Sequence, residues 1–285
     1  MVNLDHFSIV DTGHSTRNAT KSWCPFNFVG QDSNTLVVTV GDSWTWGCDM
    51  TPDDNEDHRL KHHYGRTIAD HLAADWLNLG QGGAGNFWIC DKVKELALVI
   101  PTWDYKKIYV ICTFTEIGRA INSRQDIDFY NFFQTQSLDQ LLPWLNDLCV
   151  ERITGSLSQC VNVQLVIGTN FVDWTGATYD FLIKPCWVEL LSRQCGIDHD
   201  HQCHVVSSWV FDEFSQLSEL TKDSVEFKNL LHSWLDAAID RANLIRKIPA
   251  ITRTLSPATG AMLTGHPNAA GHKVWAEAIL SHLGT

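Results

Sequence analysis

Short apolar runs alternate with longer amphipathic stretches along the chain. The strand-like runs span residues 36–40, 108–114 and 161–167, with a weaker one at 204–208. Between them, apolar residues recur at the spacing of one helical face, in residues 138–150, in residues 224–247 and at Tyr64, Ile68, Leu72 and Trp76. This alternation predicts a parallel sheet covered by helices on both faces.

The last amphipathic stretch predicts a C-terminal helix with a defined start. Asn268 is a residue type that caps helices well, because its side chain accepts a hydrogen bond from the first helical N–H groups. Trp275, Ile279 and Leu283 follow at helical spacing. We expect these three residues to form the buried face of that helix.

Length and composition indicate one domain with an N-terminal extension. The chain has 285 residues, of which 44% are hydrophobic, enough to bury a full core. Residues 1–34 are rich in Asn, Thr, Ser and Asp and show little periodicity. We therefore assign residues 1–34 to an extension that wraps the domain or contacts a partner, and residues 35–285 to the domain itself.

The charge balance excludes some partners. There are 21 basic and 33 acidic residues, a net charge of −12, whereas binding to a phosphate backbone needs clustered Lys and Arg. No run approaches the roughly 20 apolar residues of a membrane span, and residues 1–13 lack the features of a signal peptide. We expect a soluble protein that binds neither nucleic acid nor membrane and is not exported by the general secretory route.

Cysteine and tryptophan are both informative. The nine cysteines have no regular spacing, and most lie in or beside apolar segments, which favours buried reduced thiols over a disulfide framework. Among the twelve tryptophans, Trp44, Trp46 and Trp88 lie near the turn described next. They serve either as core residues or as a flat platform for sugar rings or acyl groups.

A candidate nucleophile follows the first predicted strand. The apolar run 36–40 breaks into Gly41, Asp42 and Ser43, and open α/β sheets carry reactive side chains at the carboxyl ends of their strands. A serine hydroxyl needs a base to take its proton. His266 is the candidate base, because it lies in the segment that opens the last helix.

These two segments resemble known motifs. GDSWTWG is similar to the first conserved block of the SGNH (GDSL-type) hydrolases, and GHPNAAGH to their last block. The resemblance implies a three-layer α/β/α, flavodoxin-like fold with a central parallel sheet, with Ser43 as nucleophile and His266 as base. It also implies an oxyanion hole formed by the N–H groups of Ser43 and Gly83, the latter in residues 78–83, which resemble the glycine block.

Two positions depart from the family pattern. The family usually shows Gly-x-Asn-Asp after the strand at 108–112, but here Thr115 replaces the asparagine, so its hydroxyl is the candidate third oxyanion donor. The family aspartate three residues before the histidine is replaced by Leu263. Either a backbone carbonyl orients His266, giving a Ser–His dyad, or a carboxylate from another loop does so.

Other residues near the motifs are candidates for binding. Asp42, Trp44, Trp46 and Arg119 are assigned to substrate binding, although Asp42 also suits a role in holding the turn. Glu116 and Arg119 follow Thr115 and either line the ligand crevice or form an ion pair at a helix start.

Two histidine clusters resemble parts of metal sites. His199, His201 and Cys203 alternate along an extended segment, but no second ligand pair of matching spacing accompanies them. His58 and His62 lie one helical turn apart, again without an obvious third ligand. We therefore expect neither a metal nor another cofactor.

The predicted function is acyl-ester hydrolysis by Ser43 and His266. An O-acetyl group on a carbohydrate is the preferred substrate, because tryptophans suit a sugar and no long lipid-binding cap is evident. The alternative is a catalytically inactive binding or structural protein that keeps the fold, as the replacements at Thr115 and Leu263 would suggest. Because phage virions sometimes carry such domains to trim host glycans, a cytoplasmic or a virion-associated protein would fit.

Overall fold

The computed structural model describes most of the chain, with gaps. The described residues are 2, 26–48, 50, 55–82, 84–115, 138–170, 179–197, 247–255 and 262–285. The predicted strand at 204–208 and nearly all of the predicted helix at 224–247 lie outside them.

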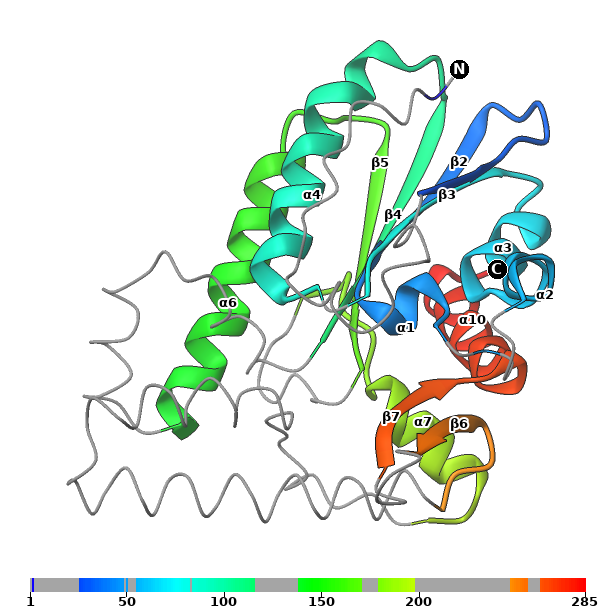
Figure 1. Ribbon diagram of the computed structural model, residues 1–285. Coiled ribbons are helices and arrows are strands. Elements are labelled where there is room, and N and C mark those ends of the chain that lie inside the picture. Colours follow the sequence, from blue (N-terminus) through cyan, green and yellow to red (C-terminus); the bar gives the residue numbers. More distant parts are fainter. Residues whose placement is uncertain are drawn as a thin grey trace, which may run out of the picture.

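A mostly parallel sheet forms the centre of the described structure (Figure 1). Its strands are β1 (Asn27–Val29), β2 (Thr35–Gly41), β3 (Asp75–Gly80), β4 (Lys107–Phe114) and β5 (Val163–Thr169). The spatial order is β1-β3-β2-β4-β5, and all neighbours pair in parallel except β1, which is antiparallel to β3 at one edge. The three main apolar runs predicted as strands are thus confirmed.

The order of the parallel strands identifies the topology. In chain order, β2, β3, β4 and β5 are the first to fourth parallel strands, and they lie side by side as second, first, third, fourth. This is the flavodoxin-like arrangement, in which the order reverses beside the first strand. The carboxyl ends of β2 and β4 therefore meet at the point where such sheets bind ligands.

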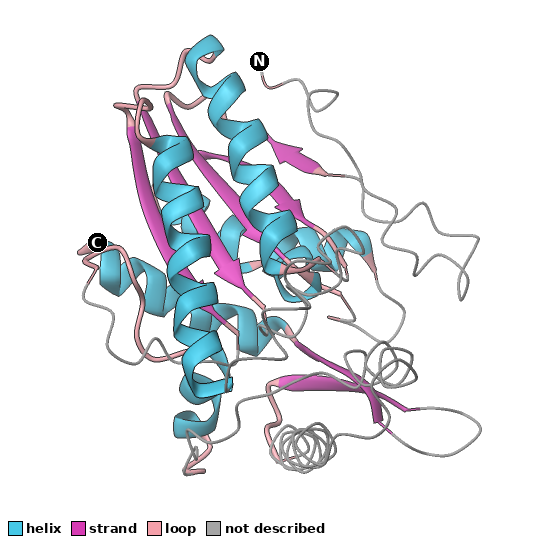
Figure 2. Ribbon diagram, turned by 90° about the vertical axis from the view of Figure 1, so that its left-hand side faces the viewer, coloured by secondary structure: helices cyan, strands magenta, loops and turns pink. Residues whose placement is uncertain are grey.

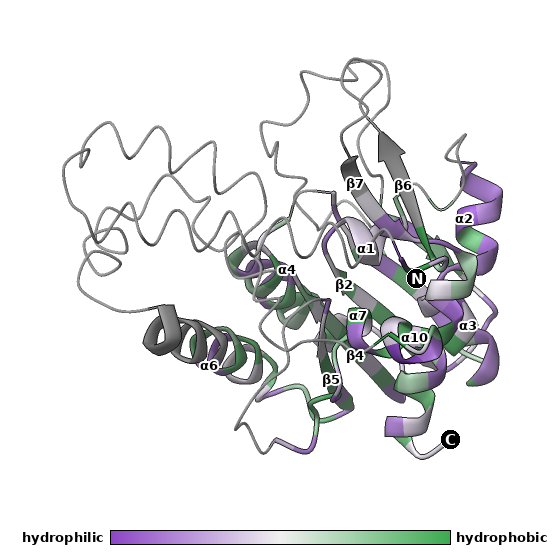
Figure 3. Ribbon diagram, turned by 90° about the horizontal axis from the view of Figure 1, so that it is seen from below, coloured by the Kyte–Doolittle hydropathy of each residue, from purple (hydrophilic) through white to green (hydrophobic). Residues whose placement is uncertain are grey.

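Helices cover both faces of the sheet, which confirms the predicted three layers (Figures 1 and 3). One face is covered by α4 (Asn86–Val99) and α6 (Leu138–Leu157), which lie next to each other in Figure 2. The opposite face is covered by α3 (Tyr64–His71), α7 (Trp187–Gln194) and α10 (Ala269–Leu283).

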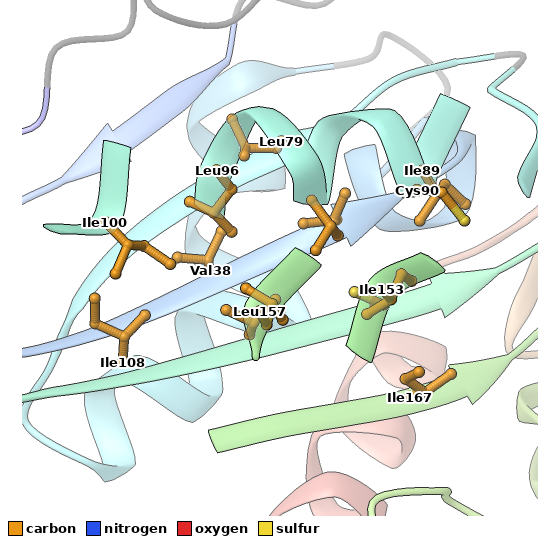
Figure 4. Close-up of a cluster of buried hydrophobic side chains, with 14 of the residues drawn as sticks. Val38, Leu79, Ile89, Cys90, Leu96, Ile100, Ile108, Ile153, Leu157 and Ile167 are labelled. Carbon is orange, nitrogen blue, oxygen red and sulfur yellow. The ribbon is translucent and has the colours of Figure 1, made fainter. Parts of the chain in front are cut away.

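Successive side chains of a strand point to opposite faces of the sheet, so the core is divided into two clusters, one on each face. Val38 on β2 belongs to the same buried cluster as Ile89 and Leu96 of α4 and Ile153 of α6 (Figure 4). Its neighbour Val37 packs on the other side, in a cluster with residues of α3, α7 and α10. Both faces of a parallel sheet are buried in this way, and each fully buried Leu or Ile side chain contributes about 1.5–3 kcal/mol.

Shorter elements complete the described structure. They are α1 (Ser43–Trp46), α2 (Glu56–His62), η2 (Ile100–Thr102), and the antiparallel hairpin of β6 (Ile251–Leu255) and β7 (Met262–Pro267). The C-terminal helix begins as predicted, because the Asn268 side chain accepts hydrogen bonds from the N–H groups of Ala270 and Gly271. Trp275 and Ile279 are buried, and Leu283 is partly buried.

The prediction that Trp76 lies on the same helical face as Tyr64, Ile68 and Leu72 is wrong. α3 ends at His71, Ala73 adopts a left-handed backbone conformation with φ 48°, and Trp76 lies in β3. All residues of β3 are buried, and the Trp76 indole donates to the Thr39 hydroxyl at 3.2 Å. The spacing of four residues was a coincidence across a turn, and burial in the sheet decided the conformation.

Part of the segment assigned to the extension belongs to the sheet. Within residues 1–34, β1 pairs with β3, and the Asp75 carboxylate accepts hydrogen bonds from the N–H groups of Gln31 (2.5 Å) and Ser33 (3.3 Å). Tyr105 donates to the same carboxylate at 2.7 Å. Residues 26–34 are therefore anchored on the edge of the sheet, whereas residues 3–25 lie outside the described part.

The described cysteines are free thiols, and most are buried. Cys90, Cys112, Cys149 and Cys160 are all buried, as predicted, and Cys203 lies outside the described residues. Burial raises the pKa of the Cys112 thiol, which keeps it protonated and unreactive. Within the described ranges, every helix is too short or too polar to cross a membrane.

Candidate active site

Ser43 lies where β2 turns into α1. The Asp42 side chain caps this short helix by accepting a hydrogen bond from the Trp44 N–H at 3.0 Å, and Gly47 ends it in a left-handed conformation with φ 87°. Ser43 is only 6% exposed. The sequence Gly-Asp-Ser therefore forms a tight strand-to-helix turn that holds the serine at the carboxyl edge of the sheet.

Two glycines allow this turn to lie against the strand ends. A Cβ atom at Gly41 would overlap the Thr45 side chain, and one at Gly80 would lie 2.5 Å from the Trp46 nitrogen. Any side chain at either position would push α1 away from β2 or β3. Both glycines are thus required by close approach of the helix that carries Ser43.

Asp42 holds the turn together with a residue that the sequence analysis missed. Asn170 directly follows β5, and its amide donates to the Asp42 carboxylate at 3.0 Å. The Asn170 backbone is held as well, since its N–H donates to the Phe114 carbonyl and its carbonyl accepts from the Val188 N–H. The buried Asp42 therefore holds the turn, and its assignment to substrate binding stays a prediction. The signal for Asn170 was a polar residue shortly after the predicted strand at 161–167.

A long-range hydrogen bond connects the serine segment to the histidine segment. The Trp44 indole N–H donates to the Gly265 carbonyl at 3.1 Å, which joins the neighbour of Ser43 to the neighbour of His266 across 221 positions. Figure 1 shows α1 and the β6–β7 hairpin at the same end of the sheet. His266 is 7% exposed and pairs with Thr252 in the hairpin. The segments that carry the two candidate catalytic residues thus lie in contact with each other.

The segment before His266 does not have a regular strand geometry. The pairing of β6 with β7 shifts from Thr254 opposite Thr264 to Leu255 opposite Met262, so Leu263 is the extra residue of a β-bulge. Position 263, where the family has its aspartate, is therefore a local irregularity in the backbone as well as a change of residue type.

Thr115 lies beside the nucleophile turn by strand register. Gly41 pairs with Thr113, and Ser43 and Thr115 each follow two residues later at the same edge of the sheet. Thr115 is 2% exposed, and its hydroxyl has no hydrogen-bond partner among the described residues. A buried hydroxyl without a partner costs free energy, so such groups are more typical of functional sites than of ordinary cores.

Several predicted site residues lie outside the described part. These are Gly83, Glu116 and Arg119 of the crevice, and His199, His201 and Cys203 of the possible metal set. The loop carrying Gly83 leaves β3 next to the nucleophile turn, because the Gln81 N–H donates to the Gly41 carbonyl at 3.0 Å. The oxyanion role of Gly83 stays a prediction.

The tryptophans near the site differ in their surroundings. Trp44 is 2% exposed and meets Trp187 edge to face, with ring centroids 5.3 Å apart, which favours the first predicted alternative, a core residue, over a sugar platform. Trp46 is half-buried, and the Arg59 guanidinium lies 4.1 Å from its ring centroid. Trp88 is also half-buried, with the Lys92 ammonium 5.3 Å from its ring. Trp46 remains the predicted substrate-binding tryptophan.

The structure offers no metal site within the described residues. No group of three or more His, Cys, Asp or Glu side chains there is arranged to hold an ion. The rings of His58 and His62 are 4.3 Å apart on α2, as helical spacing requires, but two ligands do not make a closed site.

A buried histidine pair braces the nucleophile helix against α10. His63 accepts a hydrogen bond from the Gly65 N–H at its Nδ1 and donates from Nε2 to the Thr45 carbonyl of α1. His272 of α10 accepts from the Tyr64 N–H at 3.3 Å, and its ring centroid lies 5.0 Å from that of His63. Burial lowers the pKa of His63 to about 3, and burial together with the charges of His63 and His266 lowers the pKa of His272 well below its usual value.

We expect the free energy of unfolding to fall when the pH drops below about 6.5. The unfolded chain takes up a proton on His63 near pH 6.5, whereas the folded protein does so only near pH 3. The contribution of His63 to the free energy of unfolding is therefore complete above the pKa of the unfolded state. Below that pH it falls by about 1.4 kcal/mol per pH unit, down to the pKa of the folded state. Urea unfolding of the wild type and His63→Gln between about pH 7 and pH 4 should show a shallower slope in the variant. His282→Gln, at the exposed end of α10, is the control and should keep the wild-type slope; an unchanged slope in His63→Gln would contradict this assignment.

Comparison with protein-family models finds no match, and comparison with curated proteins finds none either. Among solved structures, the chain is similar to a member of the lipolytic protein G-D-S-L family from Veillonella parvula DSM 2008. The similarity covers 87% of this chain and 97% of that chain, with 13% sequence identity and a TM-score of 0.35. At this degree of similarity, the geometry of the chain's own site is what indicates its function.

Proposed function

We propose that the protein is a serine esterase that hydrolyses acyl esters with Ser43 as nucleophile and His266 as general base. The observation that carries this proposal is the hydrogen bond from the Trp44 indole to the Gly265 carbonyl, because it joins the two segments on which the chemistry depends. A serine becomes a useful nucleophile only with such a base nearby.

The reaction would follow the two steps of acyl transfer. The Ser43 hydroxyl attacks the ester carbonyl while His266 takes its proton, and the tetrahedral intermediate collapses as His266 returns the proton to the leaving alcohol. Water then attacks the acyl-enzyme with His266 again as base, which releases the acid and regenerates Ser43. The Ser43 and Gly83 N–H groups and the Thr115 hydroxyl would donate hydrogen bonds to the oxyanion of the intermediate. Each would stabilise the transition state by about 3 kcal/mol.

The burial of the site supports a small acyl group. Ser43, His266 and Thr115 are all buried, so the reacting carbonyl has to reach atoms below the surface. An acetyl group fits this requirement better than a long chain. The half-buried Trp46, whose ring stacks with the Arg59 guanidinium at 4.1 Å, is the candidate contact for the alcohol part. We therefore propose O-acetyl groups on a carbohydrate as the substrate class.

Labelling with a fluorophosphonate probe tests the proposal. Such a probe reacts with an activated serine, and we expect mass spectrometry to locate a single adduct on Ser43. Ser192 serves as an internal control, because its hydroxyl is buried and donates to the Val188 carbonyl at 2.8 Å. Absence of an adduct on Ser43 in the folded protein would favour the alternative of a non-catalytic binding or structural protein with this fold.

A further inference from the structure

We infer that Asn86 is a positioning residue of the oxyanion hole, holding Thr115 so that the threonine hydroxyl is presented to the reacting carbonyl. This inference rests on the proposed esterase function. It concerns a residue that lies in neither of the two motifs and that acts through Thr115 without touching the substrate.

The side chain of Asn86 binds both backbone groups of Thr115. Its Oδ1 accepts a hydrogen bond from the Thr115 N–H at 2.9 Å, and its Nδ2 donates to the Thr115 carbonyl at 3.2 Å. Thr115 lies just beyond the last residue of β4, where the regular pairing of the sheet has ended. One amide thus replaces the neighbouring strand and fixes the backbone of Thr115.

This arrangement leaves the Thr115 hydroxyl as the group with an open hydrogen bond. Both backbone groups of Thr115 are satisfied, and Oγ1 has no partner among the described residues. Threonine is branched at Cβ and has few allowed rotamers, so fixing its backbone restricts the direction of the hydroxyl. A preorganised donor of this kind is what stabilisation of an oxyanion requires.

Asn86 also connects the two loops that carry candidate oxyanion donors. It is the first residue of α4, directly after the loop that contains Gly83. The helix is capped by Gly85 without a side-chain hydrogen bond, and the Asn86 amide reaches across to Thr115. A change at Asn86 should therefore displace the Thr115 hydroxyl relative to the loop that contains Gly83.

The substitution Asn86→Asp tests this role. A carboxylate still accepts from the Thr115 N–H but repels the Thr115 carbonyl, whereas a protonated carboxyl group can make both hydrogen bonds. We expect kcat for p-nitrophenyl acetate to fall by about 10- to 100-fold near pH 8 with KM nearly unchanged, because small displacements of catalytic groups have effects of that size. The ratio of variant to wild-type kcat should recover as the pH is lowered and the carboxyl group protonates.

Asn162→Asp is the matched control. The Asn162 amide also donates to a backbone carbonyl, that of Tyr105 at 2.8 Å, but it lies at the amino end of β5, away from the site. The same chemical change there should leave kcat and its pH profile as in the wild type. Equal losses in both variants would show a general effect of the substitution and would overturn the inference.

A double-mutant cycle separates positioning from a separate structural role. Thr115→Val keeps the shape and deletes the hydrogen bond, and we expect it to lower kcat by about 10² to 10³ with KM nearly unchanged. If Asn86 acts through Thr115, then Asn86→Asp should lower kcat by less than about twofold further in the Thr115→Val background. Effects that multiply would overturn the inference while leaving the esterase intact. A wild-type protein that forms no adduct on Ser43 would overturn the proposed function, and this inference with it.

Discussion

Ser43→Ala is expected to abolish hydrolysis of p-nitrophenyl acetate, with a loss of roughly 10⁵- to 10⁶-fold in kcat, as for other serine nucleophiles. The variant removes the only atom that attacks the ester, and the remaining oxyanion donors cannot replace it. The fold should persist, because Asp42 and the glycines shape the turn while Ser43 contributes only its hydroxyl. Initial rates and thermal unfolding of the purified variant measure both outcomes.

The controls for this experiment address other sources of activity. Ser156→Ala, whose hydroxyl donates to the Arg152 carbonyl in α6, should behave as the wild type in both assays. EDTA should leave the wild-type rate unchanged. Activity retained in Ser43→Ala would refute the serine mechanism, and loss of activity with EDTA would direct attention to His199, His201 and Cys203.

The second large effect is expected at His266, and its comparison with the acidic residues distinguishes a dyad from a triad. His266→Ala should lower kcat about as much as Ser43→Ala, because the serine then lacks its base. If a backbone carbonyl orients the imidazole, no single removal of a carboxylate should reproduce that loss. Replacement of a triad aspartate by asparagine can cost about 10⁴-fold, since the wrong tautomer of the histidine is populated, so the two mechanisms differ measurably.

Conservative substitutions of the buried acids test for a triad without unfolding the protein. Asp42→Asn keeps an acceptor for the Trp44 N–H, so the turn survives the loss of charge. Glu189→Gln probes another buried acid among the described residues, which lies on α7 and whose Oε1 is paired with Arg193. A carboxylate anywhere in the chain whose removal matches the loss in His266→Ala, without loss of folding, would establish a triad in place of the dyad.

The sequence by itself determined the parts of the molecule that depend on local patterns. Runs of apolar residues located β2, β4 and β5, because both faces of a parallel sheet are buried and its strands are apolar throughout. Asn268 marked the start of α10, because capping is a local hydrogen bond between a side chain and the next turn. The order of strands and helices then sufficed to predict three layers.

The tertiary structure decided what depends on partners distant in the chain. Trp76 lies at helical spacing from Leu72, yet it is in a strand, because β3 is completed by β1 and β2 on either side. From the sequence, Trp44 suited a core residue or a binding platform equally, and its burial against Trp187 and its hydrogen bond to Gly265 decided for the core. Neither partner is near Trp44 in the sequence.

The same distinction applies to the site. Ser43, His266 and Thr115 were found from motifs, because their residue types and their places after strands are local properties. Asn86 and Asn170 were not, since each acts on a residue 29 and 128 positions away, respectively, through hydrogen bonds that exist only in the folded chain. Sequence patterns thus located the groups proposed to react, and only the folded structure identified Asn86 and Asn170, because a hydrogen-bond partner is defined by distance in space and not along the chain.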